Sequence, residues 1–235
     1  RVKLKGRSRL RDLGVDAGAG YKRVVGIRNT RLKAGAKRAV KIGRLARGFA
    51  KAGRFYNTSA APKAFYGNRV MGASPTVLQT ARAAAADATG VGKGGRCTPT
   101  SVALGLGASS DPALRLRREF FKQWFDLWVE HSEVRPQVTK GWPHMLAKLT
   151  KAKSRLRLVK GPIGVAIATL LDVGWWPKAA EEWIDDQGGS WRICPGAPLG
   201  AFQEALGLCI SKVCWRRAAL HEDGGGLERI PCFHI

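Results

Sequence analysis

Two adjacent aspartates, Asp185 and Asp186, are the residues of this chain whose types and spacing come nearest to a catalytic centre. They follow Trp183–Ile184, and an aromatic residue, a spacer and two aspartates can hold a pair of metal ions for phosphoryl transfer. That chemistry needs the acids on a tight turn between apolar strands. Because two glutamates precede the motif and Gln187 begins a glycine-rich turn after it, we predict instead the solvated end of a short acidic helix at residues 177–186.

Other candidates for catalysis do not form a recognisable site. The glycine-rich stretch at residues 90–95 lacks the spacing and the Lys-Ser/Thr ending of a phosphate-binding loop. The histidines are scattered: His131, His144, His221 and His234. His221 has Glu222 and Asp223 beside it, which leaves open a small helical enzyme with this histidine in a pocket; a surface turn is the simpler interpretation.

Five cysteines at irregular spacing argue against the disulfide framework of a secreted protein, since their number is odd. Reduced thiols in an intracellular setting, nuclear or cytoplasmic, are the interpretation we adopt. A zinc site is the alternative, although no tight Cys-x-x-Cys pair anchors it. Its ligands would come from Cys209, Cys214, His221, Cys232 and His234. We predict no metal and no cofactor.

A run of cations between Arg31 and Lys51 carries the clearest chemical signal. On a helix with about 100° per residue, six of them fall within roughly 120° of arc. These six are Lys33, Lys37, Lys41, Arg44, Arg47 and Lys51. Cations one helical turn apart are spaced by about 5.4 Å, which is comparable to the spacing of charges along a nucleic-acid backbone. Each phosphate that they neutralise releases counterions, and this release favours binding. Because the segment has no Asp or Glu to form i,i+4 ion pairs, we predict a phosphate-binding face rather than an ordinary solvated one.

The opposite side of this helix is predicted to dock on the rest of the chain. Its apolar residues are Leu32, Ala39, Ile42, Leu45, Ala46 and Phe49. Arg31 and Arg38 project to the same side, so either the face is imperfect or their stems snorkel outward. Gly35, Gly43 and Gly48 weaken the expectation of an unbroken helix.

The positive charge is concentrated in the first third of the chain. Residues 1–71 contain 20 Lys and Arg and two acids, Asp12 and Asp16, and so carry +18 of the net charge of +24. This part is therefore the expected partner of a polyanion. No apolar run approaches the roughly 18 residues that a membrane span needs, and the basic start is not followed by the apolar core of a signal peptide.

Most of the chain is predicted to be helical. Short strands are expected at residues 13–15 and 24–27, and the basic helix is expected to end near Gly53. Later helices are predicted at residues 75–89, from Ser110 onward, and at 162–171, 177–186 and 198–220. A Gly-, Ser- and Thr-rich linker at 91–110 is predicted to separate a basic region, 1–90, from a helical C-terminal region, 111–235.

Aromatic residues are dense in the helix that begins near Ser110. They are Phe120, Phe121, Trp124, Phe125 and Trp128. Their helical spacing favours core packing, with stacking on single-stranded bases as the sharper alternative. Basic residues return at 138–160, where a second phosphate-contacting surface and an ordinary exposed helix both stay open.

The order of short motifs resembles a segment of the reverse transcriptases of non-LTR retrotransposons. Leu13-Gly14-Val15, the basic helix, Pro62–Gly67, Gly72–Pro75 and the alanine-rich helix around Arg82 are similar to the late strand of that family's palm and its thumb helices. The region with Asp111-Pro112, and Trp215–His221 with Gly224–Glu228, is similar to the section of such reading frames beyond the thumb.

This resemblance implies a mainly α chain: a helical, thumb-like bundle with a short N-terminal β element, followed by a second helical region. It also implies a template- and primer-gripping fragment of an RNA-directed DNA polymerase whose catalytic aspartates lie upstream of Arg1, so that the chain alone does not polymerise. The alternative is a free-standing basic RNA- or DNA-binding protein of ribonucleoprotein or chromatin type.

Overall fold

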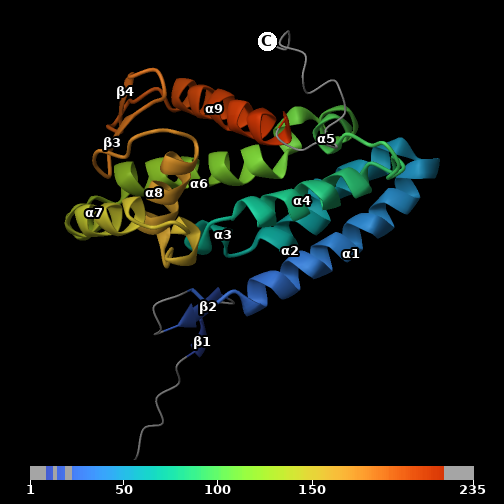
Figure 1. Ribbon diagram of the computed structural model, residues 1–235, viewed down its shortest axis with the longest axis horizontal. Helices are drawn as coiled ribbons and strands as arrows, with labels where there is room; N and C mark the ends of the chain where they lie inside the picture. The colour runs from blue at the N-terminus through green and yellow to red at the C-terminus, as the bar shows by residue number, and fades with distance from the viewer. Residues whose placement is uncertain (1–8, 13–14, 19–22, 220–235) are drawn as a thin grey trace, which may run out of the picture.

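The computed structural model describes residues 9–12, 15–18 and 23–219, and these are mostly helical (Figure 1), which confirms the predicted mainly α class. At the start, β1 (Arg9–Asp12) and β2 (Val15–Gly18) form an antiparallel hairpin. Of the strand expected at 13–15, Val15 begins β2, and residues 13 and 14 lie outside the described ranges. The strand expected at 24–27 is wrong. Valine and isoleucine favour strands, but the Val25 carbonyl accepts a hydrogen bond from the Asn29 amide (3.0 Å) and begins a helix.

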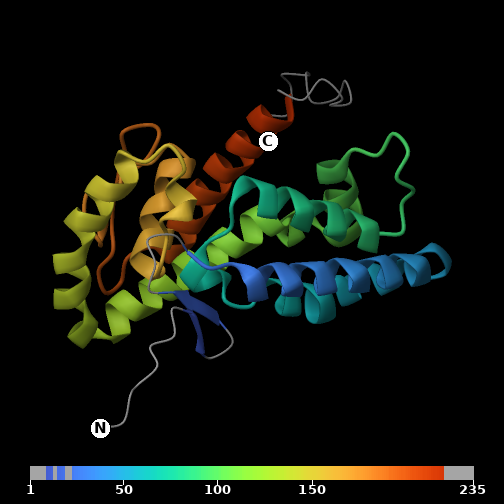
Figure 2. The same ribbon diagram turned by 60° about the horizontal axis from the view of Figure 1, so that its bottom comes forward.

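The first group of helices packs around the basic one, α1 (Gly26–Gly48). It comprises α2 (Ala61–Phe65), α3 (Asn68–Met71), α4 (Pro75–Ala88) and α5 (Thr98–Leu106). A 3₁₀ turn, Ala50–Arg54, and a π-helical turn, Tyr56–Ala60, connect α1 to α2. Figure 1 shows α1 along the lower edge of the molecule, and Figure 2, in which that side comes forward, shows it across the front, beside α2 and α4. Its other side is therefore open to solvent.

Small side chains dominate the core under α1. Its buried alanines come from four elements and include Ala39, Ala60, Ala64, Ala81 and Ala85. Two glycines of α1 sit at the helix contacts: a Cβ on Gly35 would meet the Ala64 Cβ at 2.5 Å, and one on Gly43 would meet the Asp87 carbonyl oxygen at 1.9 Å. The helix is unbroken because these glycines serve close packing rather than a break.

A second group of helices surrounds an aromatic core. It comprises α6 (Pro112–Glu130), α7 (Arg135–Thr150), α8 (Pro162–Asp172) and α9 (Leu199–Ala219), with the hairpin β3 (Glu182–Ile184) and β4 (Ser190–Arg192). The stripe on α6 is buried here: Phe120, Phe121, Trp124, Phe125 and Trp128. Phe202 of α9 contacts the rings of Phe125 (4.9 Å between centroids) and Trp183 (5.2 Å). Core packing, not base stacking, is the role of these aromatics.

The acidic helix predicted at 177–186 is wrong, since its second half is β3. Two indoles from other helices bind the carbonyl oxygens that such a helix would use: Trp142 Nε1 donates to Pro177 and Trp124 Nε1 to Ala180, both at 3.0 Å. These contacts come from residues at least 35 positions away and keep the segment out of a helix. Its sequence alone did not contain that information.

The stretch expected as a linker, residues 91–110, contains helix α5 and a 3₁₀ turn, Ala108–Ser110. Val102 of α5 is fully buried in the first core. Arg82 of α4 then joins the two helical groups, because its Nε and Nη2 bind the carboxylate of Asp111, which caps α6 by accepting from the Ala113 amide. The helices predicted at 75–89 and from Ser110 onward are confirmed as α4 and α6. Ser74 caps the first and Asp111 the second.

Candidate nucleic-acid interface

The six predicted cations are all exposed, and we call them the basic face: Lys33, Lys37, Lys41, Arg44, Arg47 and Lys51. Five of them lie on α1, whose buried face is formed by residues such as Leu32, Ala39 and Ile42 and packs on α2 and α4. Within residues 23–219, no ion pair joins any of the six to a carboxylate. Their charges are available to an external anion.

Lys51 stands apart from the other five. The helix was expected to end near Gly53, but α1 ends at Gly48, where Phe49 takes an extended conformation (φ −144°, ψ 90°). Lys51 then lies in the 3₁₀ turn Ala50–Arg54. The regular spacing of one cation per helical turn therefore applies to Lys33 through Arg47 only.

The two arginines on the apolar side turn out to bind the neighbouring segment. The Arg31 guanidinium carbon lies 4.5 Å from the centre of the Tyr66 ring, a cation–π contact. Arg38 Nη1 donates to the carbonyl (3.3 Å) and the hydroxyl (3.2 Å) of Ser59. Both side chains thus reach the neighbouring segment, while Leu32, Ala39 and Ile42 of the docking face stay buried.

Three apolar side chains extend the basic face, and two of them were expected to be buried. Leu45 is 63% exposed and Phe49 is 62% exposed, which contradicts their predicted place in the docking face; Phe55 is 57% exposed. Leu45 follows Lys41 by four residues, so it shares the solvent side of α1. Phe49 lies beyond the end of α1, where helical spacing no longer applies. Cations and exposed aromatics are therefore interleaved near the end of α1.

The second basic stretch is divided between a helix and a loop. α7 ends at Thr150, and a 3₁₀ turn, Arg155–Arg157, comes after it. Five of its cations are exposed: Lys140, Lys151, Lys153, Arg157 and Lys160. They do not share one helix face, so both interpretations of this stretch stay open.

The two aspartates lie on the turn between β3 and β4, and their carboxylates are engaged by the protein. Asp185 accepts from Trp191 Nε1 (2.8 Å) and from the amides of Gln187 (2.8 Å) and Gly189 (2.7 Å). Burial opposes ionisation of Asp185, but these hydrogen bonds outweigh it and lower the pKa of the carboxyl. Asp186 accepts from the Cys209 thiol (2.8 Å), which lowers its pKa as well.

The cysteine and histidine sites fall largely outside the described residues. Cys209 is buried and accepts from Trp175 Nε1 (3.1 Å); burial raises the pKa of its thiol to about 11. His221, Cys232 and His234 of the alternative zinc set, and the neighbours of His221, lie outside the described ranges. Within those ranges, no group of three or more His, Cys, Asp or Glu side chains is placed to hold a metal ion.

None of the described helices is long and apolar enough to cross a membrane. Comparisons with protein-family models, with curated proteins and with solved structures gave no match for this chain.

Proposed function

We propose that this chain grips nucleic acid through the basic face, binding the sugar-phosphate backbone by charge and shape. The observation that carries the proposal is the set of six exposed cations on α1 and the turn after it, without carboxylate partners among the described residues. Such a surface binds duplexes and single strands alike, since it reads phosphates rather than bases.

The order of elements supports a more specific proposal, a template- and primer-gripping fragment of a retroelement reverse transcriptase. A short β hairpin, β1–β2, comes directly before the basic helix, and small helices then lead to the alanine-rich α4. This is the order of a late palm strand and thumb helices in the family that the sequence resembles. An upstream reading frame that encodes a palm with paired aspartates would favour this proposal over a free-standing nucleic-acid-binding protein.

The exposed rings of Phe49 and Phe55 add a surface on which unpaired bases can stack. They lie in the segment that also holds Lys51 and Arg54. Binding of single strands is therefore part of the proposal, beside binding of duplexes.

Charge reversal on the basic face tests the proposal. We expect the variant Lys37→Glu, Lys41→Glu, Arg44→Glu to bind both an RNA–DNA hybrid duplex and a single strand about a hundredfold more weakly at roughly 0.1 M salt, because three phosphate contacts are lost. Fluorescence anisotropy with labelled oligonucleotides measures both affinities.

The matched control reverses three exposed cations on other elements, with Lys122→Glu, Arg192→Glu and Arg216→Glu. It changes the net charge of the chain by the same amount. Equal losses of affinity in the two triple variants would show that overall charge, and not the basic face, drives binding.

A further inference from the structure

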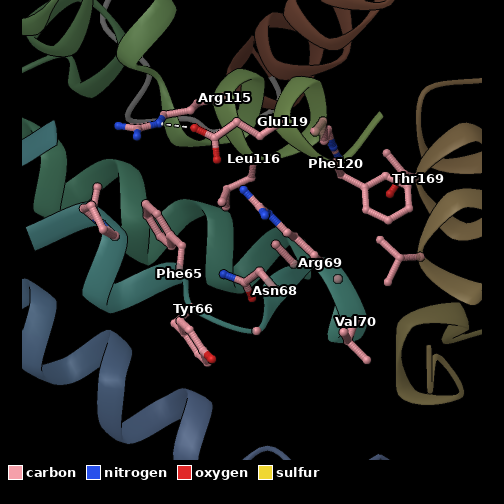
Figure 3. A pocket seen from close by; sticks show the side chains of 17 residues that line it. Phe65, Tyr66, Asn68, Arg69, Val70, Arg115, Leu116, Glu119, Phe120 and Thr169 are labelled. Carbon is pink, nitrogen blue, oxygen red and sulfur yellow. Dashed lines mark hydrogen bonds and ion pairs between the residues drawn. The ribbon is translucent and has the colours of Figure 1, made fainter. Parts of the chain in front are cut away.

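A cleft of about 570 Å³ opens where the two helical groups meet (Figure 3). Its walls come from the α2–α3 segment on one side, and from α6 and Val165 and Thr169 of α8 on the other. This size lies within the range of roughly 300–1,000 Å³ that small-molecule sites occupy. Phe65 and Phe120, both buried, line it with Leu116.

Asn68 adds a buried polar side chain to the cleft, whose lining also includes Arg69, Arg115 and Glu119. Its side chain lines the cleft and is only 6% exposed, and its Oδ1 has no hydrogen-bond partner among the described residues. A buried acceptor without a partner lowers the stability of the fold, and buried polar groups are almost always satisfied. The oxygen itself is closed to solvent, so an N–H donor in the cleft would satisfy it after rotation of the Asn68 side chain toward the ligand.

The charges around the cleft favour an anionic ligand. Two arginines of the lining are already paired with carboxylates of the protein: Arg115 with Glu119 (2.7 Å), and Arg117 with Asp172. Arg69, in contrast, is exposed and has no ion pair with a carboxylate of the described residues. It gives the cleft a cation that can reach a bound anion.

The cleft is also connected to the basic helix. Tyr66, which lines it, is 53% exposed and carries the Arg31 guanidinium over its ring. A strand that lies along α1 would therefore pass within reach of the cleft.

We infer that this cleft binds one nucleotide, with the base between the apolar walls, the Asn68 oxygen accepting an N–H of the base edge, and Arg69 contacting the phosphate. Adenine, cytosine and guanine each offer an amino donor, and the Asn side chain is a common partner of base edges. The inference deepens the proposed function, on which it rests for the source of the ligand: an unpaired nucleotide of a bound strand, or a free mononucleotide.

Two variants separate ligand binding from a structural role. Replacing Asn68 with Leu removes the unsatisfied oxygen at similar side-chain volume, so the midpoint of thermal unfolding is expected to stay the same or rise. Nucleotide binding is expected to fall at least tenfold. Arg69→Ala is expected to weaken binding of phosphorylated ligands, with Lys63→Ala, an exposed cation of α2 outside the cleft, as its control.

The experiment titrates the full chain with AMP, GMP, CMP and UMP by calorimetry, and with a blunt hybrid duplex and the same duplex carrying a single-stranded overhang by anisotropy. Binding of a mononucleotide that Asn68→Leu abolishes supports the site with a free ligand. The duplex with the overhang is expected to bind roughly tenfold more tightly than the blunt duplex, in line with the contribution of one held base. If Asn68→Leu abolishes this preference, the site is supported with a bound strand as the source of the nucleotide.

Two results overturn the inference. One is that no mononucleotide binds and the overhang duplex binds no better than the blunt duplex. The other is that Asn68→Leu binds as the unaltered chain does. If mononucleotide binding sensitive to Asn68 persists while the blunt duplex is not bound, the cleft is supported and the gripping function of the basic face fails instead.

Discussion

At the scale of single residues, the hydrogen bonds of Asp185 determine what its carboxylate can do. Its two oxygens already accept three N–H groups within the β3–β4 hairpin. A metal ion at this position would have to replace those donors, and the neighbouring Asp186 is turned to Cys209 and Lys212 instead. The paired aspartates therefore stabilise a turn and the packing of α9 against it.

We predict that Asp185→Ala lowers the free energy of unfolding by about 1–3 kcal/mol, because three N–H groups lose a charged acceptor. Affinity for nucleic acid stays unchanged. Urea denaturation at neutral pH measures the stability, and Glu204→Ala, which removes an exposed carboxylate of α9, is the control. Loss of nucleic-acid binding without loss of stability would contradict the structural role.

The same variant has a predicted pH dependence. The folded pKa of Asp185 lies below its ordinary value of 3.8, so its contribution to stability is complete above that value and is lost as the pH falls through the folded pKa. The difference in stability between the unaltered chain and Asp185→Ala is therefore expected to shrink in acid. A difference that grows as the pH falls would contradict the lowered pKa.

At the scale of elements, the position of α1 depends on glycines that allow close approach. The Gly43 site leaves no room for a Cβ against the carbonyl oxygen of Asp87, whereas the Gly48 site has open space around it. Both residues lie in the same helix, but only the first lies where α1 meets the end of α4. The orientation of the basic face follows from this contact.

We predict that Gly43→Ala lowers the free energy of unfolding by about 2 kcal/mol or more, since the backbone of α4 must move away. Gly48→Ala, at the last residue of α1, is the matched control and is expected to change it by less than about 0.5 kcal/mol. Thermal unfolding followed by circular dichroism measures both. Equal effects of the two variants would mean that the close contact is absent.

Local signals predicted the elements that carry their own caps. The helices from Ser74 and Asp111 begin where an oxygen side chain and a following proline predict. The exposure of Lys33 through Arg47 was also predictable, because helical spacing alone separates them from the buried face. The conformation of residues 177–186 was not predictable, since indoles from distant helices determine it. The exposure of Phe49 was not predictable either, because it depends on where α1 ends.

At the scale of the whole molecule, Arg82 and Asp111 link the alanine-rich group of helices to the aromatic one. Both side chains are largely buried, and the Arg82 guanidinium binds both oxygens of Asp111. Burial opposes the charge of Arg82, but the Asp111 carboxylate outweighs it and raises the arginine's pKa. The cleft lies between the same two groups, and no local pattern could have predicted it, because its walls come from α2–α3, α6 and α8.

We predict that Arg82→Ala lowers the free energy of unfolding by about 3 kcal/mol, because Asp111 stays buried without its partner. Lys178→Ala breaks the exposed pair with Glu182 and is expected to cost at most about 0.5 kcal/mol. Equilibrium urea unfolding of both variants measures the difference. A change as small for Arg82 as for Lys178 would contradict the role of the buried pair in joining the two groups.

The salt dependence of nucleic-acid binding tests the central claim most directly. For the unaltered chain, the logarithm of the binding constant for a hybrid duplex is expected to fall linearly with the logarithm of the salt concentration. The Lys37→Glu, Lys41→Glu, Arg44→Glu variant is expected to show a slope smaller by about 2.7, because each phosphate contact on a duplex contributes about 0.9. An unchanged slope in this variant would mean that α1 does not contact the phosphates.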